Sequence, residues 1–150
     1  MANNDSDATV TSIRVRYADT DQMKVAYNGV YFTWFEIGRT EMIRETGLTY
    51  GDIEKTGILL PVIEAGVKYL KPARYDDVLS VRTTIENQKG IRIRFRYELF
   101  RDDELLATGF TEHVFSDTNL KPVRPRGRLA DLNAFINETK VKNDDTRILQ

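Results

Sequence analysis

Four stretches in the second half of the chain alternate apolar and polar residues with a period of two. They span about 59–71, 78–89, 91–101 and 104–117. In the first three stretches one face carries Ile63, Ala65, Val67 and Tyr69, then Leu79, Val81, Thr83 and Ile85, then Ile91, Ile93, Phe95, Tyr97 and Leu99. This period is typical of β-strands that place one face on a core. Because the connections are short and turn-like, the sequence predicts an antiparallel meander.

One long helix is predicted ahead of these strands. The residues at helical spacing are Tyr31, Trp34, Phe35, Gly38 and Met42. The helix is expected to start near Asn28 and to stop at Gly47, since glycine commonly follows the last helical turn. Its apolar face is rich in aromatic rings, which favours a helix buried against a sheet.

Three shorter elements complete the predicted order. Ile13, Val15 and Tyr17 alternate with arginines and predict a first strand. Residues 49–56 predict a short polar helix, and a final helix over 128–138 presents Leu129, Leu132, Phe135 and Ile136. The predicted fold class is therefore α+β, with five antiparallel strands and the long helix packed on a curved sheet.

The length and organisation of the chain favour one domain. No internal repeat and no Pro/Gly/Ser-rich linker divides the 150 residues, and a chain of this length buries a sizeable core. The folded domain is expected over 12–138. The ends, 1–11 and 139–150, are polar or highly charged and are expected to be flexible or lightly docked.

The composition excludes several classes of function. The 22 Lys and Arg against 23 Asp and Glu argue against broad binding of nucleic acid or anionic membranes. Without cysteine there is no disulfide, thiol nucleophile or sulfur-ligated zinc, and a single histidine excludes a His-rich metal site. No apolar run is long enough to span a membrane and the start of the chain is polar, so the cytoplasm is the expected compartment.

Two carboxylates, Asp19 and Asp21, stand in the segment YADTD just ahead of the long helix. In one interpretation they only cap the helix and its turn, because negative charge is favourable near a helix start. In the other, the helix start donates hydrogen bonds to a developing oxyanion while a carboxylate attacks or activates water. Residue spacing alone leaves both interpretations open.

The wider pattern resembles the 4-hydroxybenzoyl-CoA thioesterase family of hot-dog-fold enzymes over about 12–125. The resemblance is carried by YADTDQMKVAYNGVYFTWFEIGRTEMIRETG and LPVIEAGVKYLKPARYDDVLSV. Its fixed points are the Asp-x-Asp loop ending at Asp21, aromatics at Tyr27 and Tyr31, and the segment from Tyr69 to Asp77. The resemblance implies the hot-dog fold, in which a five-stranded antiparallel sheet wraps around one long central helix.

The resemblance also implies a reaction, the hydrolysis of an acyl-CoA thioester to free acid and coenzyme A without a further cofactor. Active sites are expected at the interface of a homodimer, with dimers pairing into a homotetramer. Asp21 aligns with the family's catalytic carboxylate, either as nucleophile through an anhydride or as general base for water. Asn28 aligns with the position whose backbone N–H polarises the thioester carbonyl, and Tyr27 is assigned to the same catalytic group.

Substrate binding is assigned to Tyr31, Glu64, Lys71, Lys89 and Arg92. In the family, basic residues at the turn between central strands bind the anionic nucleotide of the coenzyme, and Lys89 and Arg92 flank that turn here. Lys71 is a weaker candidate for binding this nucleotide. Arg92, together with Arg94 and Arg96, could also simply form the solvated face of a strand. Glu64 either assists Asp21 across the dimer or faces solvent or an arginine.

Several residues leave the function open. Lys24 stands where the family's loop usually has glycine, so a positive φ there would be strained, or its ammonium could meet a coenzyme phosphate. Glu36 and Arg39 are interpreted as an i,i+3 pair, and His113 as structural. The alternatives to an acyl-CoA thioesterase are a non-catalytic acyl-CoA binding or sensor module and an acyl-carrier-protein thioesterase that docks through the arginines of 92–96.

Overall fold

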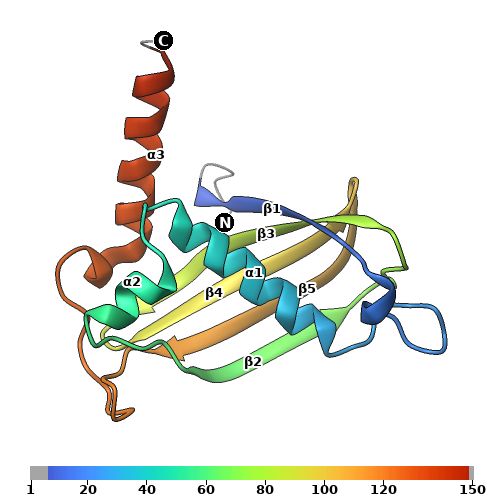
Figure 1. The fold of residues 1–150 in the computed structure, drawn as a ribbon, viewed down its shortest axis with the longest axis horizontal. Coiled ribbons are helices and arrows are strands. Elements are labelled where there is room, and N and C mark those ends of the chain that lie inside the picture. The colour runs from blue at the N-terminus through green and yellow to red at the C-terminus, as the bar shows by residue number, and fades with distance from the viewer. Residues whose placement is uncertain (1–6, 149–150) are drawn as a thin grey trace.

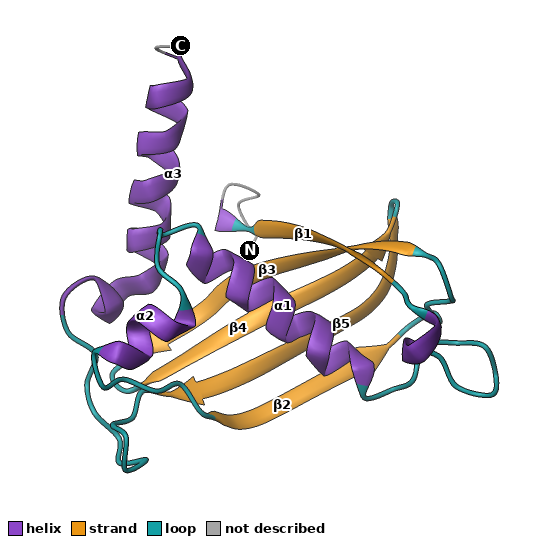
Figure 2. Cartoon of the chain, viewed as in Figure 1, coloured by secondary structure: helices purple, strands orange, loops and turns teal. Residues whose placement is uncertain are grey.

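The computed structural model describes residues 7–148. Five strands form one antiparallel sheet, and helices lie across one face and at one end of it (Figure 2). The strands are β1 (Thr9–Arg14), β2 (Val62–Tyr69), β3 (Val78–Lys89), β4 (Arg92–Arg101) and β5 (Glu104–Val114). The helices are α1 (Val30–Arg44), α2 (Tyr50–Lys55) and α3 (Leu132–Ile148), with 3-10 turns η2 (Tyr17–Asp19) and η3 (Gly127–Asp131). The α+β fold class predicted from the sequence is confirmed.

The order of the strands across the sheet is β1-β3-β4-β5-β2. The hairpins β3–β4 and β4–β5 follow the predicted meander, but the meander is wrong for β2, which pairs with β5 at the far edge. The reason is that β1 already occupies the free edge of β3, where Thr9 lies opposite Thr83. β2 is left as an edge strand, and the apolar side chains of Val62, Ile63 and Tyr69 are each 47% exposed.

Helix α1 lies across the curved sheet and covers its inner face (Figure 1). Phe35 is fully buried and stacks on Tyr97 of β4, with ring centroids 4.5 Å apart and planes 6° from parallel. Gly38 lets the helix approach β3 closely, because a Cβ there would lie 2.8 Å from Val81 and would collide with Thr83. These contacts fix the helix on the sheet and therefore fix the position of both helix ends.

The ends of several elements differ from the prediction. β1 begins at Thr9 and stops at Arg14, because η2 then turns the chain, although the Val15 N–H still bonds the Asp77 carbonyl in the register of the β1–β3 ladder. Tyr17 is consequently 80% exposed. The long helix begins at Val30 rather than Asn28, since the Val30 N–H closes a turn onto the Tyr27 carbonyl at 3.1 Å.

Ordered elements also reach into both predicted tails. Thr9 and Thr11 pair with β3, and α3 continues to Ile148, well past the predicted stop at 138. The remaining parts of the predicted tails, 1–6 and 149–150, lie outside the described residues. Gly47 follows the end of α1 with a φ of 85°, as its predicted stop role requires. Over 7–148, no helix combines the length and apolar composition needed to cross a bilayer.

Candidate active site

The loop between η2 and α1 is held against the connection from β2 to β3. The Ala26 N–H donates to the Ala73 carbonyl at 2.8 Å, and Val25 forms an isolated β-bridge with Arg74. A cavity of about 350 Å³ opens beside this loop. Its lining includes Asp21, Asn28, Tyr31, Tyr69 and Lys71. Four of the residues predicted from the sequence therefore meet at one cavity: Asp21, Asn28, Tyr31 and Lys71.

The two carboxylates of the YADTD segment have different surroundings. Asp19 is buried and accepts hydrogen bonds from the Arg16 guanidinium at 2.9 and 3.3 Å and from the Arg16 backbone N–H at 2.8 Å. Burial pushes the pKa of the Asp19 carboxyl upward, but the hydrogen bonds and charge of Arg16 outweigh burial and hold that pKa below its usual value. The capping interpretation therefore applies to Asp19.

Asp21 instead lies at the cavity. Its Oδ1 accepts the Met23 N–H at 2.8 Å, which orients the carboxylate, and its other oxygen accepts no hydrogen bond from the described residues. No lysine or arginine of the described chain forms an ion pair with it. The structure thus leaves Asp21 as an oriented carboxylate with one oxygen available to a bound molecule.

The start of α1 supplies unpaired backbone donors beside this carboxylate. Across the described chain, the N–H groups of Asn28 and Gly29 find no acceptor, and the helix has no side-chain cap at Gly29. Helix starts carry partial positive charge, so these donors suit an anionic oxygen. Tyr27 covers the turn from outside. Its ring packs so closely on Gly29 that a Cβ there would lie 2.7 Å from it.

Aromatic rings form one wall of the cavity. Tyr31 is buried and packs against Trp34 at a centroid distance of 4.9 Å and edge-on against Tyr69 at 4.8 Å. Lys71 also lines the cavity, but its ammonium is paired with Glu104 at 2.8 Å. The wall offers an apolar surface with two phenol groups.

The structure does not bring Glu64 to this cavity. Glu64 pairs with Glu112 across the β2–β5 ladder, and its carboxylate lies 3.5 Å from the Arg94 guanidinium. Arg94 also approaches Glu86 and Glu112 and stacks over the Phe110 ring at 4.1 Å. This group of charges lies on the sheet face away from α1, as expected of a solvated strand face.

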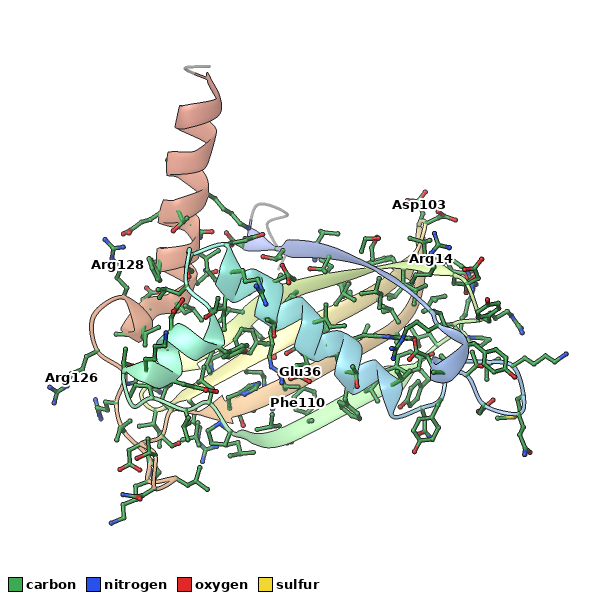
Figure 3. All side chains as sticks on the ribbon, viewed as in Figure 1. Arg14, Glu36, Asp103, Phe110, Arg126 and Arg128 are labelled. Carbon is green, nitrogen blue, oxygen red and sulfur yellow. The ribbon has the colours of Figure 1, made fainter. Side chains whose placement is uncertain are left out.

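Lys89 and Arg92 lie at the opposite end of the sheet from Asp21. They flank the β3–β4 turn, where the Gln88 side chain holds the Leu129 carbonyl at 2.7 Å. Figure 3 shows Arg126 and Arg128 at this end and Arg14 at the other, where Arg14 bonds Asp76 close to the Asp21 loop. Within one chain, the predicted coenzyme-binding cations are therefore far from the predicted catalytic carboxylate.

A second group of cations, which the sequence analysis missed, joins Lys89 and Arg92 at their end of the sheet. It consists of the exposed side chains of Lys121, Arg124, Arg126 and Arg128. None of the four forms an ion pair with another described residue, although Arg128 lies over the Phe135 ring. Arg124 and Arg126 line a cavity of about 610 Å³. The sequence signal for this group is the segment KPVRPRGR, which has four cations in eight residues.

A buried polar group lies under the middle of α1. Glu36 and Arg39 do not form the predicted ion pair, and the charge of Arg39 instead acts on the hydroxyls of Tyr50 and Tyr97.

The His113 ring nitrogens contact the Leu60 carbonyl and the Thr111 hydroxyl, each at 2.9 Å. Burial lowers the pKa of His113 to about 4, so this histidine is uncharged at neutral pH. In the described part of the chain, no cluster of His, Asp and Glu could hold a metal ion.

Comparison with known proteins decides the family. A family model described as the thioesterase superfamily matches residues 23–108, which is more than half of the chain. The chain belongs to the thioesterase superfamily. The acyl-CoA thioesterase YbgC of Haemophilus influenzae is 32% identical to it over 113 residues, covering 74% of this chain and 83% of the relative. YneP of Bacillus subtilis is 35% identical over 130 residues, covering 85% and 94%.

Solved structures agree with this assignment. The DHNA-CoA thioesterase of Staphylococcus aureus superposes with a TM-score of 0.78 at 34% identity, covering 93% of this thioesterase and 94% of that chain. A 4-hydroxybenzoyl-CoA thioesterase superposes with a TM-score of 0.76 at only 18% identity, which shows the fold alone. The hot-dog fold and thioester hydrolase class are thus confirmed, whereas the finer resemblance to 4-hydroxybenzoyl-CoA thioesterases is distant.

Replacing Asp19 by Asn is expected to lower the free energy of unfolding at pH 7 by about 1–3 kcal/mol, because it removes a buried, charge-assisted acceptor of Arg16. The folded-state pKa of Asp19 lies below the unfolded value of about 3.9. Its contribution is therefore complete above pH 4 and is lost as the pH falls through the folded-state pKa. Urea unfolding at pH 7 and pH 3 measures both effects.

Asp76→Asn is the matched control, since its ion pair with Arg14 is well exposed and should contribute less than about 1 kcal/mol. Equal losses in the two variants, or a loss in Asp19→Asn that does not shrink at low pH, would contradict the role given to Asp19.

Lys24→Gly is expected to stabilise the protein by about 1 kcal/mol. Lys24 has a φ of 64°, the left-handed region that costs a residue with a side chain about 1–2 kcal/mol. The urea midpoint should rise at unchanged slope. Gln22→Gly, two residues away without a positive φ, should instead lower it. A lower midpoint for Lys24→Gly would show that the lysine makes a compensating contact.

Proposed function

We propose that this thioesterase hydrolyses an acyl-CoA thioester in the cavity at the start of α1. One observation carries the proposal. The oriented carboxylate of Asp21 and the unpaired N–H of Asn28 line the same cavity beside an apolar wall. A thioester needs both groups, because its carbonyl carbon is attacked while negative charge collects on its oxygen.

In the proposed reaction the thioester oxygen accepts the Asn28 N–H, and the positive end of the α1 dipole stabilises the oxyanion. Asp21 then acts by one of two routes. As a nucleophile it forms an anhydride, expels the coenzyme thiolate and is released by water. As a general base it removes a proton from the attacking water. Both routes yield the carboxylic acid and coenzyme A, and neither needs a cofactor. Tyr27 shields the helix start from solvent.

The departure at Lys24 supports catalysis over a non-catalytic binding module. Although Lys24 takes the left-handed conformation, its N–H still closes the turn onto the Asp21 carbonyl at 2.9 Å. The Asp21 N–H likewise bonds the Val25 carbonyl at 3.0 Å. The loop therefore keeps Asp21 at the cavity in spite of the substitution.

The proposal includes a homodimer joined through β2. An exposed apolar edge strand is a template for pairing with another chain. Two antiparallel β2 strands related by a two-fold axis would bring the cationic end of one protomer beside the Asp21 loop of the other. That end, with Lys89, Arg92 and Arg124, would then receive the anionic nucleotide of the coenzyme whose thioester lies at Asp21. The sheet face that carries Arg94 is covered by no described helix, which supports further pairing into tetramers (Figure 1).

A carrier-protein substrate is the second candidate. The four unpaired cations of 121–128 would also suit the surface of an acidic carrier protein, so the same Asp21 site could act on a carrier-bound acyl group. This location replaces the arginines of 92–96 as the favoured docking surface, because Arg92 and Arg94 already approach carboxylates of their own chain. Hydrolysis of carrier-bound but not coenzyme-bound acyl groups would distinguish this candidate.

Asp21→Asn is expected to reduce thiol release from acyl-CoA at least about 100-fold, because Asn is neither a nucleophile nor a base. A panel of short, long and aromatic acyl-CoAs is assayed with a thiol reagent, to which the cysteine-free protein contributes no background. Asp103→Asn, on the exposed β4–β5 turn labelled in Figure 3, is the control and should keep full activity.

Undiminished release by Asp21→Asn would contradict the role of Asp21. If the unmodified protein released no thiol from any acyl-CoA, the acyl-CoA reaction would be excluded in favour of carrier-bound substrates or a binding module.

A double variant, Lys89→Ala with Arg124→Ala, is expected to raise KM for acyl-CoA about tenfold and leave kcat within about twofold, because the lost contacts are made equally in ground and transition states. The matching acyl-pantetheine, which lacks the nucleotide, should show no change in KM. Arg44→Ala, another exposed arginine, serves as control. Equal effects on both substrates would contradict the proposed nucleotide contact.

A further inference from the structure

Tyr69, which the sequence analysis did not place among the site residues, makes an unusual contact with the start of α1. It is the last residue of edge strand β2, and its hydroxyl donates a hydrogen bond of 2.6 Å to the Asn28 carbonyl, 41 residues earlier in the chain. Tyr69 also lines the cavity that holds Asp21. The contact therefore links the sheet edge directly to the proposed oxyanion donor.

The backbone around Asn28 shows what this bond fixes. The peptide before the Asn28 Cα contains the Tyr27 carbonyl, which accepts the Val30 N–H at 3.1 Å. The peptide after it contains the Asn28 carbonyl, which accepts the Tyr69 hydroxyl. The Asn28 N–H lies in the plane of the first peptide, and the two anchors together hold both of the planar peptide units that meet at the Asn28 Cα. The first of these anchors is local, whereas the second comes from another element.

No side chain of α1 itself could replace this anchor. The helix has no side-chain cap, and Gly29 at its N-cap is a residue with high conformational freedom. The Gly29 carbonyl is occupied by the Phe32 N–H at 3.3 Å. Without the Tyr69 hydroxyl, the Asn28–Gly29 peptide could rotate, and the Asn28 Cα with its N–H would be held by the local Tyr27–Val30 turn alone.

The Tyr69 ring is itself held in place. It packs edge-on against Tyr31, with planes 86° apart, and the hydroxyl of buried Tyr31 accepts a hydrogen bond from the Ala73 backbone. Loss of solvent contact, with a smaller effect of Tyr27, raises the pKa of Tyr69, so its hydroxyl is a protonated donor at neutral pH. A fixed donor on a rigid strand gives the geometric precision that oxyanion stabilisation needs.

We propose that Tyr69 is a positioning residue for thioester hydrolysis, whose hydroxyl anchors the Asn28 carbonyl, and with it the Asn28 Cα, so that the N–H of the same residue meets the developing oxyanion. The assignment rests on the proposed function of the Asp21 cavity. Tyr69 need not touch the reacting atoms, and it acts through Asn28. The effect should therefore appear in kcat, where transition-state geometry matters, more than in KM.

Tyr69→Phe and Tyr69→Leu separate the hydroxyl from the ring. Phe keeps the packing on Tyr31 and loses only the hydrogen bond, so kcat should fall about tenfold while KM stays within about twofold. In Tyr69→Leu, kcat should fall at least as far as in Tyr69→Phe. Tyr75→Phe removes an exposed hydroxyl elsewhere and should leave kcat unchanged. Full activity in Tyr69→Phe with a loss only in Tyr69→Leu would show that the ring alone matters and would overturn the proposal.

Hydrogen–deuterium exchange gives a readout that does not need activity. In Tyr69→Phe, amide exchange over 28–33 should rise at least about threefold, with no change at the other end of α1 or in Tyr75→Phe. Unchanged exchange at the helix start would overturn the positioning role even if kcat fell. No turnover in the unmodified protein would refute the proposed function, and exchange would then decide alone whether Tyr69 holds the helix start.

Discussion

The close packing of α1 on the sheet is the contact on which the rest of the structure depends. Phe35 stacks flat on Tyr97, and Gly38 removes the side chain that would keep the helix away from Val81 and Thr83. Close packing of this kind tolerates little displacement. The start of the helix is thereby fixed next to the end of β2, where the Asp21 loop is in turn bonded to Ala73. The Asp21 carboxylate, the Asn28 N–H and the aromatic wall of the cavity are therefore held in fixed positions relative to one another.

The same packing places the predicted catalytic carboxylate and the predicted coenzyme-binding cations at opposite ends of the sheet. A helix laid along the sheet has its donor end at one end of the strands, whereas the β3–β4 turn and the basic segment 121–128 lie at the other (Figure 3). Under the proposed function, one chain holds a reacting centre and a cationic surface that a single coenzyme molecule would have to join. In the proposed homodimer, the exposed apolar edge at β2 pairs with a two-fold partner and so brings these two ends together.

The sequence predicted the elements whose pattern is local. The period of two in β3 and β4 and the helical spacing of the α1 aromatics identified most of the core. Asp21 and Asn28 were placed by resemblance, and burial then distinguished Asp21 from Asp19. The edge position of β2 was not predictable from short turns, because it depends on β1 taking the other edge of β3. The Tyr69 contact with Asn28 and the turn of Arg39 toward two tyrosines depend on tertiary packing and leave no periodic signal.

The most direct test of a site shared between protomers mixes two defective proteins, Asp21→Asn and the double variant Lys89→Ala with Arg124→Ala. At an acyl-CoA concentration well below KM, Asp21→Asn is nearly inactive alone and the double variant keeps about one tenth of normal activity. After subunit exchange, half of the dimers hold one protomer of each kind, and one of their two sites has Asp21 from one chain and intact cations from the other. The account predicts recovery of about one quarter of normal activity. No recovery after demonstrated exchange would show that carboxylate and cations act within one chain, and would contradict the shared site.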